Sequence, residues 1–504
     1  MRVTVLALLF VLALGTLLTP SYQAGQCVCG TKKTLLVLAE FPEYPHLSSQ
    51  EEINSLFFSK VARYFYDMSY GRFAVSGNST SWITLPRLYS QYVGSGLNQG
   101  VMNMAKDAFN FASKSYNMAA FDFVFLVLSF YPSLTGDFIP NYGHPIGTGS
   151  GMVAGFAVIE EDRDWSAYAH AFALSLGLWH IQSQLSGLGT NDLSANGDGE
   201  MSTWSRAALG WINDSQVLSM DASAAGEIGT IDPVEDPGVD ALALRISMGG
   251  SAGEYWVEVR QPLGYDRNNL QDYGALVTYI PPSNASIQFR KVLQPDIISK
   301  AIFLDPTSDI SIVVLNVTVD RFRLLVGDAE VGRDAEIAIY AISRAQDSVQ
   351  SAESETRFQN LDLAQKLLVN AHELFSLGKF SDANALAVSA ETTADAATVP
   401  PDYPQTVQLL GTAEGLKNTT SPSGSYPSSS LIQQANAQLD MANQAFELRD
   451  FSTAKGAAQS AIDLFNKARQ MELYGTILSW LTNLVLILPV VILAFALRYQ
   501  LKGI

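Results

Sequence analysis

The feature that most constrains this chain is the apolar run from Ile477 to Leu497, close to its C-terminus. The polar or helix-breaking residues inside it are few: Ser479, Thr482, Asn483 and Pro489. A run of this length can cross a bilayer, where a single segment satisfies its backbone polar groups only as a helix. Basic residues collect on the cytoplasmic side, and Arg498 and Lys502 follow the run. We therefore expect a transmembrane helix over 475–497 and a cytoplasmic tail, 498–504; a buried core helix is the alternative.

The N-terminus has the order of a secretory signal peptide. Met1-Arg2 precedes an apolar run from Val3 to Leu18, which is the pattern of a signal that directs export. We expect the signal to cover residues 1–24, and an uncleaved anchor is the alternative. A signal together with a C-terminal span predicts a single-pass protein of the cell membrane, with its ectodomain outside and its C-terminus in the cytoplasm.

Five Asn-X-Ser/Thr tripeptides lie in the part of the chain that is predicted to be outside. Each is a candidate glycosylation site, although the tripeptide also arises by chance. The five asparagines are Asn78, Asn213, Asn284, Asn316 and Asn418.

Charge and cysteine content narrow the classes of function. A net charge of −18 excludes nucleic-acid binding, which needs a basic surface. The hydrophobic fraction of 48% with 16% charged residues is typical of a globular protein. The two cysteines, Cys27 and Cys29, lie beside the expected new N-terminus. A disulfide between residues this close is expected to be strained, so the thiols are available to pair with a second chain, to bind a metal or to carry an attached group, unless they do little.

The segment 31–213 reads as an α/β domain, because short apolar strands alternate with helical patterns. We expect buried strands at Leu35–Ala39 and Phe123–Leu128. Helices are expected over 51–70, 97–115 and 165–176, the first of them introduced by a capping signal.

The third of these helices keeps part of a zinc-binding motif. In HExxHxxGxxH two histidines share one face of a helix, the glutamate is the general base, and a third ligand returns to the metal after a glycine turn. His170, Gly177 and His180 stand at the matching spacings. Ala171 replaces the general base and Leu174 replaces the second histidine. The frame of a zinc site is present without two of its working groups.

Together with this motif, other stretches in the same order resemble the secreted zinc metallopeptidases typified by immune inhibitor A. They are similar to the family's first strand with its SYG segment, its metal helix, the segment that closes its catalytic domain, and the β-rich region beyond. In this chain they are Leu38–His46 with Tyr64–Phe73, Tyr168–His180, Trp204–Ile212, and Glu254–Gln261 with Gly264–Asp266 and Gly274–Val277. The resemblance covers roughly residues 31 to 280 and implies a zincin-type head.

Carried over residue by residue, the resemblance makes His170 the first zinc ligand and His180 the third. Leu174 and Ala171 match no role. A catalytic zinc site needs three protein ligands and an open position for water, and loss of the general base costs roughly 10²–10⁴ in rate. We therefore expect no catalytic residue and no resident cofactor, with zinc at His170 and His180 as a weak candidate. In the alternative, His144 or the acidic run 160–162 completes an unusual ligand set.

The predicted secondary structure of the rest of the ectodomain changes twice, first to short strands and then to helices. Over 214–335 short alternating strands separated by Gly, Pro, Asn and Asp predict a β-sandwich. After it the chain is rich in Ala, Leu, Gln and Glu, and Ala371–Ala383 repeats as Ala442–Ala454, 71 residues later. Small residues at the contacts predict helical hairpins packed in the tetratricopeptide style.

We place the two hairpins at 336–400 and 433–472, joined by a Ser/Pro-rich linker at 401–432. Their expected role is a stalk, with a partner-binding module as the alternative.

The predicted molecule is an α+β multidomain membrane protein with a zincin-type α/β head, a β-sandwich, an α-helical hairpin stalk and one transmembrane helix. Its expected work is noncatalytic: binding an extracytoplasmic polypeptide or cell-surface protein, or acting as a scaffold. Two alternatives stay open, an active membrane-tethered zinc endopeptidase with a non-standard ligand set, and a structural surface-layer component. Self-association through the helical region would favour the second, and Cys27 and Cys29 offer another route to self-association.

Overall fold

A computed structural model describes most of the chain after the expected signal peptide. The described residues are 27–94, 97–130, 137–140, 146–178, 199–222, 226–238, 240–249, 252–267, 273–282, 288–294, 300–318, 321–420 and 426–500. The predicted signal peptide and the residues His144, His180 and Asn284 lie outside them. Contacts divide the chain into two compact units, one running to Ile339 and including Phe375–Phe380, the other holding the remaining helices.

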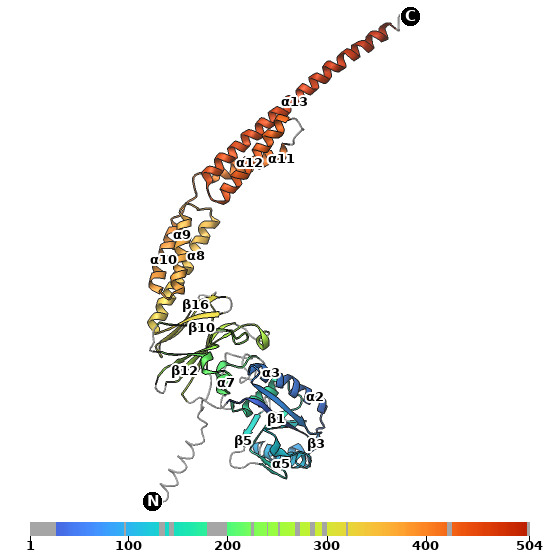
Figure 1. The fold of residues 1–504 in the computed structure, drawn as a ribbon, viewed down its shortest axis with the longest axis vertical. Coiled ribbons are helices and arrows are strands. Elements are labelled where there is room, and N and C mark those ends of the chain that lie inside the picture. Colours follow the sequence, from blue (N-terminus) through green and yellow to red (C-terminus); the bar gives the residue numbers. More distant parts are fainter. Residues whose placement is uncertain are drawn as a thin grey trace. The chain divides into compact units, whose positions relative to one another are not determined.

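A mostly parallel sheet forms the centre of the head (Figure 1). Its strands are β1 (Gly30–Glu40), β2 (Phe73–Ser79), β3 (Ile83–Thr84), β4 (Phe123–Leu128), β5 (Asp137–Pro140) and β8 (Gly155–Glu160). The order is β2-β1-β4-β8-β5, with β3 also pairing with β1. β1, β2, β4 and β8 run parallel, and β5 lies antiparallel to β8 at the edge. The two predicted strands are confirmed as parts of β1 and β4, which are buried on both faces and therefore read as unbroken apolar runs.

Helices cover both faces of this sheet. They are α2 (Gln50–Ser55), η1 (Leu56–Val61), α3 (Ala62–Met68), α4 (Tyr89–Val93), α5 (Leu97–Ala112), α6 (Trp165–Ser175) and α7 (Thr203–Ala208), with short turns η2 (Met118–Ala120) and η5 (Asp214–Gln216) and a hairpin of β6 (Ile146–Thr148) and β7 (Gly151–Val153). The α2–α3 segment and α6 share a core with Leu36 and Leu38, whereas α5 packs on Leu35 and Val37. Alternate residues of β1 thus face opposite layers. The three predicted helices are confirmed with ends shifted by a few residues.

Two sheets follow the head and enclose one core, as the alternating pattern predicts. Their strands are β9 (Val217–Asp221), β10 (Glu227–Ile231), β11 (Ala243–Ser247), β12 (Glu254–Arg260), β13 (Gly274–Ile280), β14 (Gln288–Leu293), β15 (Ile302–Asp305), β16 (Ile310–Thr318) and β17 (Arg321–Gly327), with the turn η6 (Gly264–Asp266) after β12. One sheet has the order β14-β13-β12-β11-β9 and the other β10-β17-β16-β15. Side chains of both, such as Val257 and Ile312, belong to the same core.

The helical region contains α8 (Ala329–Ser354), α9 (Leu361–Ser376), α10 (Phe380–Asp395), α11 (Tyr403–Thr419), α12 (Tyr426–Glu447) and α13 (Phe451–Gln500). The predicted linker at 401–432 is wrong, because α11 occupies much of it and α12 begins inside it. Pro404 stands in the first turn of α11, where proline costs no hydrogen bond. Leu410 and Ala413 of α11 join a core with α12 and α13, so the second hairpin is part of a three-helix bundle.

The repeat keeps its turn while changing the residue there. Gly378 and Arg449 occupy equivalent positions and both have left-handed backbones, with φ of 75° and 58°. Glycine adopts this conformation without strain, and arginine does so at some cost. The Arg449 side chain binds Glu353 at 3.1 Å and Asp362 at 3.0 Å and lies over the ring of Phe358. The turn residue is therefore a glycine in the first copy, and in the second copy it is an arginine whose ion pairs link neighbouring helices.

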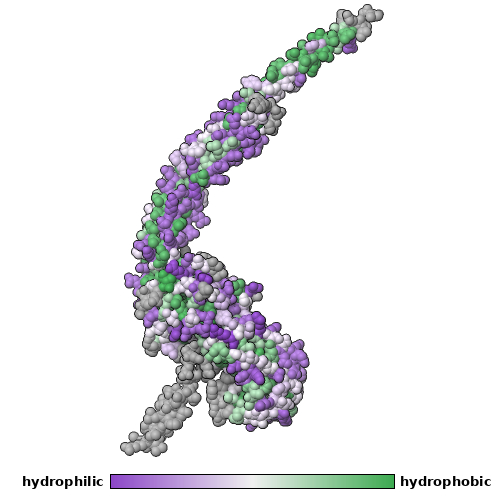
Figure 2. Space-filling model, viewed as in Figure 1, coloured by the Kyte–Doolittle hydropathy of each residue, from purple (hydrophilic) through white to green (hydrophobic). Residues whose placement is uncertain are grey.

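The last helix, α13, runs without a break from this bundle into the apolar segment. Among the described residues it is the one helix long and apolar enough to cross a membrane. Figure 2 shows the apolar surface of its C-terminal part. The apolar side chains from Ile477 to Leu497 are exposed, so this stretch is no core helix of the chain itself.

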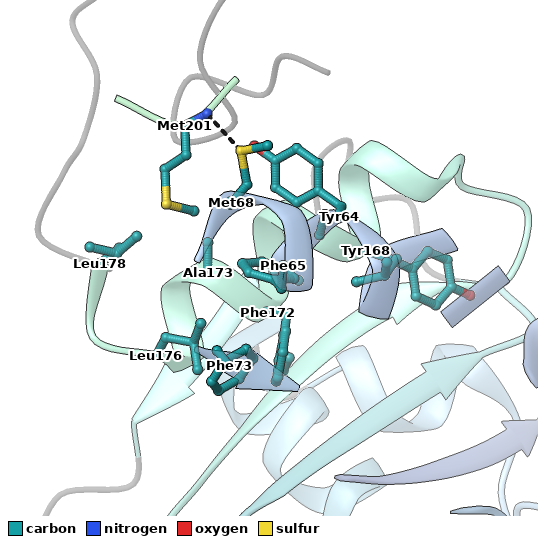
Figure 3. Packing of buried hydrophobic residues seen from close by; sticks show 14 of the residues in the cluster. Tyr64, Phe65, Met68, Phe73, Tyr168, Phe172, Ala173, Leu176, Leu178 and Met201 are labelled. Carbon is teal, nitrogen blue, oxygen red and sulfur yellow. Dashed lines mark hydrogen bonds between the residues drawn. The ribbon is translucent and has the colours of Figure 1, made fainter. Parts of the chain in front are cut away.

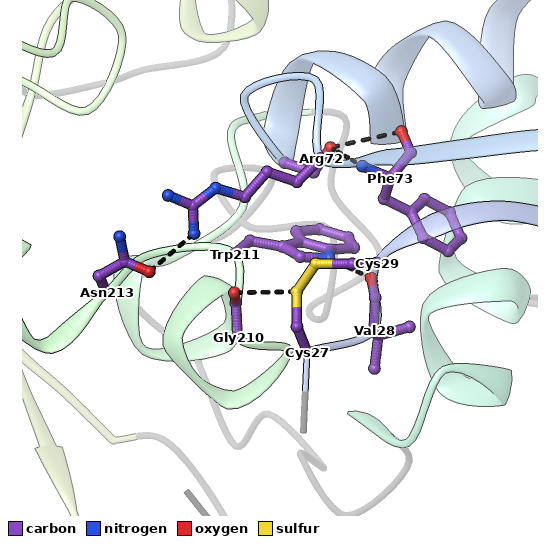
Figure 4. The surroundings of a disulfide bond; sticks show 9 residues. Cys27, Val28, Cys29, Arg72, Phe73, Gly210, Trp211 and Asn213 are labelled. Carbon is purple, nitrogen blue, oxygen red and sulfur yellow. Dashed lines mark hydrogen bonds between the residues drawn. A yellow bond between two sulfur atoms is a disulfide. The ribbon is translucent and has the colours of Figure 1, made fainter. Parts of the chain in front are cut away.

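The two cysteines are joined to each other. Their Cα atoms are 5.1 Å apart, within the range that a disulfide spans. The expectation that the thiols are free for a second chain or a metal is therefore wrong. Figure 4 shows the bond beside the segment after α7, where Cys27 Sγ lies 3.2 Å from Gly210 O and Trp211 Nε1 donates to Val28 O at 2.8 Å. The start of β1 is thereby tied to the end of the head.

This tie generates a stability prediction. Gly210 has φ of 70°, and a Cβ there would meet the Cα of Cys27 at 2.8 Å. We expect Gly210→Ala to destabilise the head by about 2–4 kcal/mol, because it adds a backbone clash to a left-handed strain of about 1–2 kcal/mol.

Gly226→Ala is the matched control, since φ is 89° there and nothing lies within 4 Å of the added Cβ. Denaturant unfolding followed by tryptophan fluorescence measures both variants. Equal losses would show that the Cys27 contact contributes nothing.

Candidate functional site

The helix that carries the damaged motif is built into the core of the head. Asp164 caps α6 by accepting from Ala167 N at 3.1 Å, which is why the helix starts directly after β8 and its turn. Figure 3 shows Phe172 against Phe65 and Phe73, with Tyr168 on the same helix. Phe172 and Tyr168 are completely buried. Large aromatic side chains therefore set the packing of α6.

The predicted site residues differ in how deeply they are buried, and one of them lies outside the described residues. His170 is 8% exposed and Ala171 is fully buried in the core shared with α3. Leu174 is partly exposed one turn later. His180 lies outside the described residues, so the pair His170 and His180 is not brought together by anything the structure describes. Within the described ranges no three His, Cys, Asp or Glu side chains are grouped so that they could hold a metal ion.

The acidic run proposed as a substitute ligand set has other partners. Glu161 is 3% exposed and accepts from the backbone of Leu47 at 2.7 Å and Ser48 at 2.6 Å. Glu160 pairs with Arg163 at 2.7 Å. Glu161 thus binds the segment before α2, Glu160 forms a local ion pair, and His144 lies outside the described residues.

The candidate glycosylation sites that can be placed are at the surface. Asn78, Asn213, Asn316 and Asn418 are all exposed. Asn213 also accepts from Arg72 Nη1 at 2.9 Å, so its amide oxygen already has a partner.

A second candidate site lies where the head meets the sandwich, a place that the sequence analysis did not single out. It is a cleft of about 370 Å³, which we call the junction cleft. Its lining comes from the end of α3, the segment before α7, the turn after β10 and η6: Tyr66, Asp67, Met68, Tyr70, Gly71, Glu200, Arg206, Val234, Glu235, Pro237, Gly264 and Tyr265. Three tyrosines and three carboxyl groups converge there.

Two buried arginines hold the ion pairs of this junction, and one of them, Arg206, lines the cleft. Arg206 is 1% exposed; its guanidinium pairs with Glu200, donates to Met201 O at 2.8 Å and to Tyr70 Oη at 2.7 Å. Arg260, 2% exposed, pairs with Glu258 at 2.7 Å and Asp266 at 2.8 Å.

The carboxylates of these ion pairs also accept hydrogen bonds from backbone N–H groups. Glu258 also accepts from Thr203 N at 2.6 Å, at the first turn of α7. Asp266 accepts from Glu200 N at 2.8 Å. Removing one partner of a buried pair costs about 3–5 kcal/mol, so the network holds α7, β12 and η6 together.

Glu235 is the most perturbed acid at this junction. Burial raises its pKa to about 9; the neighbouring Asp266 carboxylate adds to the rise, and the positive charge of Arg260 opposes it. Its Oε1 accepts from Gln261 N at 3.1 Å. Burial also raises the pKa of Tyr265 and of Tyr70. At neutral pH the cleft therefore holds the protonated carboxyl group of Glu235 and the protonated phenols of Tyr70 and Tyr265.

The arrangement has the features of a binding site. Concave sites with convergent polar groups and perturbed acids are the usual binding sites of proteins. A signal for it exists in the sequence: Glu258 and Arg260 interrupt the otherwise apolar run of β12, and both are buried. Charged residues on the core side of a strand indicate a buried network, because an unpaired charge there is costly.

Comparison with protein-family models finds no match to this chain, and comparison with curated proteins finds none either.

The raised pKa of Glu235 generates a pH prediction. Between its ordinary value of 4.5 and about 9 the folded protein keeps a proton that the unfolded chain releases. The contribution of Glu235 to the free energy of unfolding is therefore complete below pH 4.5. It decreases as the pH rises toward 9, by up to about 1.4 kcal/mol per pH unit.

We expect Glu235→Gln to flatten this decline between pH 6 and 9, because the amide keeps the shape without titrating. Denaturant midpoints followed by tryptophan fluorescence measure it, and the exposed Asp236→Asn is the control. Parallel pH profiles for wild type and Glu235→Gln would contradict the assignment.

Proposed function

We propose that this protein is a membrane-anchored, extracytoplasmic binding protein whose metallopeptidase-like head is catalytically inactive and captures polypeptides. The observation that carries the proposal is the burial of Ala171. The residue at the position of the general base is fully buried among the core side chains of the head. Neither a carboxylate nor a water-activating group stands there, and Leu174 cannot donate to a metal. The α6 framework is kept as packing, without the chemistry.

The edge of the head's sheet supports polypeptide capture. β5 is the last strand in the sheet order and contacts α6. Among the described strands it pairs on one side only, with β8. An extended polypeptide can add to such an edge through main-chain hydrogen bonds, without a metal.

The helix α13 supports the membrane anchor. Its apolar part is exposed over a length that matches a bilayer core. With a cytoplasmic C-terminus, as Arg498 and Lys502 indicate, the head and sandwich lie outside the cell.

The inactive-head proposal predicts the metal content. Purified full-length protein, incubated with zinc and desalted, should hold no stoichiometric zinc by elemental mass spectrometry, and His170→Ala should not change the result. It should also cleave no unstructured protein substrate. About one zinc per chain that is lost in His170→Ala, with zinc-dependent cleavage, would establish the active endopeptidase instead.

A gain-of-binding variant tests the resemblance of the helix itself. Leu174 is partly exposed, so Leu174→His should fold and place two histidines four apart on one helix face. We expect this variant to bind zinc at micromolar concentrations, where the wild type binds none. Ser175→His is the matched control, because this position of α6 is also partly exposed but lies five residues from His170, where the two side chains do not share a helix face. Equal zinc binding by both variants would contradict the hypothesis that α6 keeps the geometry of the zinc-binding motif.

A further inference from the structure

The junction cleft contains a carboxylate oxygen that has no partner in the protein. The Glu200 side chain is 6% exposed, and its Oε2 pairs with Arg206. Its Oε1 has no hydrogen bond to any described residue, yet Glu200 lines the cleft. This oxygen can be reached from the cleft, so a donor group that enters the cleft can bind to it.

The backbone opposite Glu200 is shaped to leave that oxygen open. Gly264 faces it, and a Cβ at this position would lie 2.9 Å from Oε1. Gly264 also has φ of 54°, a left-handed conformation that favours glycine. A side chain there would cover the carboxylate, whereas glycine keeps it accessible from the cleft.

The walls and the mouth of the cleft suit a cation. Tyr66, Tyr70 and Tyr265 contribute phenol rings, and aromatic rings attract cations: Arg63 already lies over the Tyr66 ring and Arg206 over the Tyr70 ring. Asp67 lies at the mouth with 30% of its side chain exposed, where it accepts from Tyr265 Oη at 3.2 Å and from Arg63 Nε at 2.9 Å. Arg206 cannot serve as an anion receptor, since its guanidinium is occupied by Glu200, Tyr70 and Met201.

The charges at the junction also leave room for one more cation. The carboxyl groups of Glu200, Glu235, Glu258 and Asp266 face two guanidinium groups, those of Arg206 and Arg260. The excess of carboxyl groups over guanidinium groups is two, and it falls to one while Glu235 keeps its proton. A positive charge entering the cleft would relieve it in another way.

We propose that the junction cleft binds one cationic side chain, the guanidinium of an arginine or the ammonium of a lysine, that a captured polypeptide presents. The cation donates to Glu200 Oε1 and lies among the three tyrosine rings, with Asp67 at the entrance. This inference rests on the proposed function, because it names the chemistry of the polypeptide that the head selects. It places the specificity of the protein at the junction rather than at the damaged motif.

The cation should displace a proton. Its charge favours the ionised form of Glu235, whose pKa is raised by burial. Binding near pH 7.5 is therefore accompanied by release of up to one proton, and affinity rises with pH between 6 and 9. High salt weakens binding.

The test uses the full-length protein in detergent and three small probes: Nα-acetyl-arginine amide, Nα-acetyl-lysine amide and, as the neutral control, Nα-acetyl-glutamine amide. Calorimetry in two buffers of different ionisation enthalpy measures affinity and proton release. We expect saturable binding of the arginine or lysine amide with Kd on the order of 1 mM, and none of the glutamine amide. The comparison of the two cationic amides decides between guanidinium and ammonium.

Variants locate the binding in the cleft. Glu200→Gln should weaken it by about tenfold or more, the usual effect of losing a charge-assisted hydrogen bond. Because Glu200 also pairs with Arg206, this variant can fail to fold, and Asp67→Asn and Tyr66→Ala provide the independent test; both positions are partly exposed. Each should weaken binding several-fold, whereas the exposed Glu51→Gln should leave it unchanged.

Equal binding of the glutamine amide, absence of saturation by either cationic amide, or unchanged affinity in both Asp67→Asn and Tyr66→Ala would overturn the inference. These outcomes are separable from failure of the proposed function. Zinc-dependent cleavage would overturn the inactive-head proposal, whether or not the cationic amides bind. Polypeptide capture without binding of either cationic amide would overturn only the proposal that the junction cleft binds a cationic side chain.

Discussion

Two guanidinium groups buried at the junction of head and sandwich are the constraint on which the first unit depends. Arg206 and Arg260 are almost entirely removed from water, and neither can lose its proton or remain unpaired at acceptable cost. Their carboxylate partners come from the segment before α7, from β12 and from η6. Elements far apart in the sequence must therefore keep one arrangement. The junction cleft depends on this arrangement, because Arg206 and Glu200 of the network also line it.

Aromatic side chains hold α6 in the core of the head. Tyr168 packs against Phe57 of η1, and Phe172 packs against Phe65 of α3 and Phe123 of β4. The β5 edge and the junction cleft, on which the proposed binding rests, lie on the same compact unit as this helix.

The outcome at particular residues explains which predictions succeeded. The strands at Leu35–Ala39 and Phe123–Leu128 were readable because a strand buried on both faces leaves an apolar run. The linker at 401–432 was misread because proline and serine were taken as breakers, whereas Pro404 stands in the first turn of a helix, where it is tolerated. The disulfide was misread because spacing alone does not give the distance between two Cα atoms. The junction cleft was missed because its acids and tyrosines come from four separated segments, and no local pattern connects them.

The sequence by itself determined the features that depend on local pattern: the apolar length of the span, the alternation of the sandwich strands, the helical character of the C-terminal half and the absence of base and second ligand at Ala171 and Leu174. These follow from composition and periodicity, which act over a few neighbouring residues. Only the tertiary structure decided that Cys27 bonds Cys29, that α11 completes a bundle, and that Glu200, Glu235 and three tyrosines meet in one cleft. Such facts depend on contacts between distant segments, and their energies arise only when burial removes the charges and rings from water.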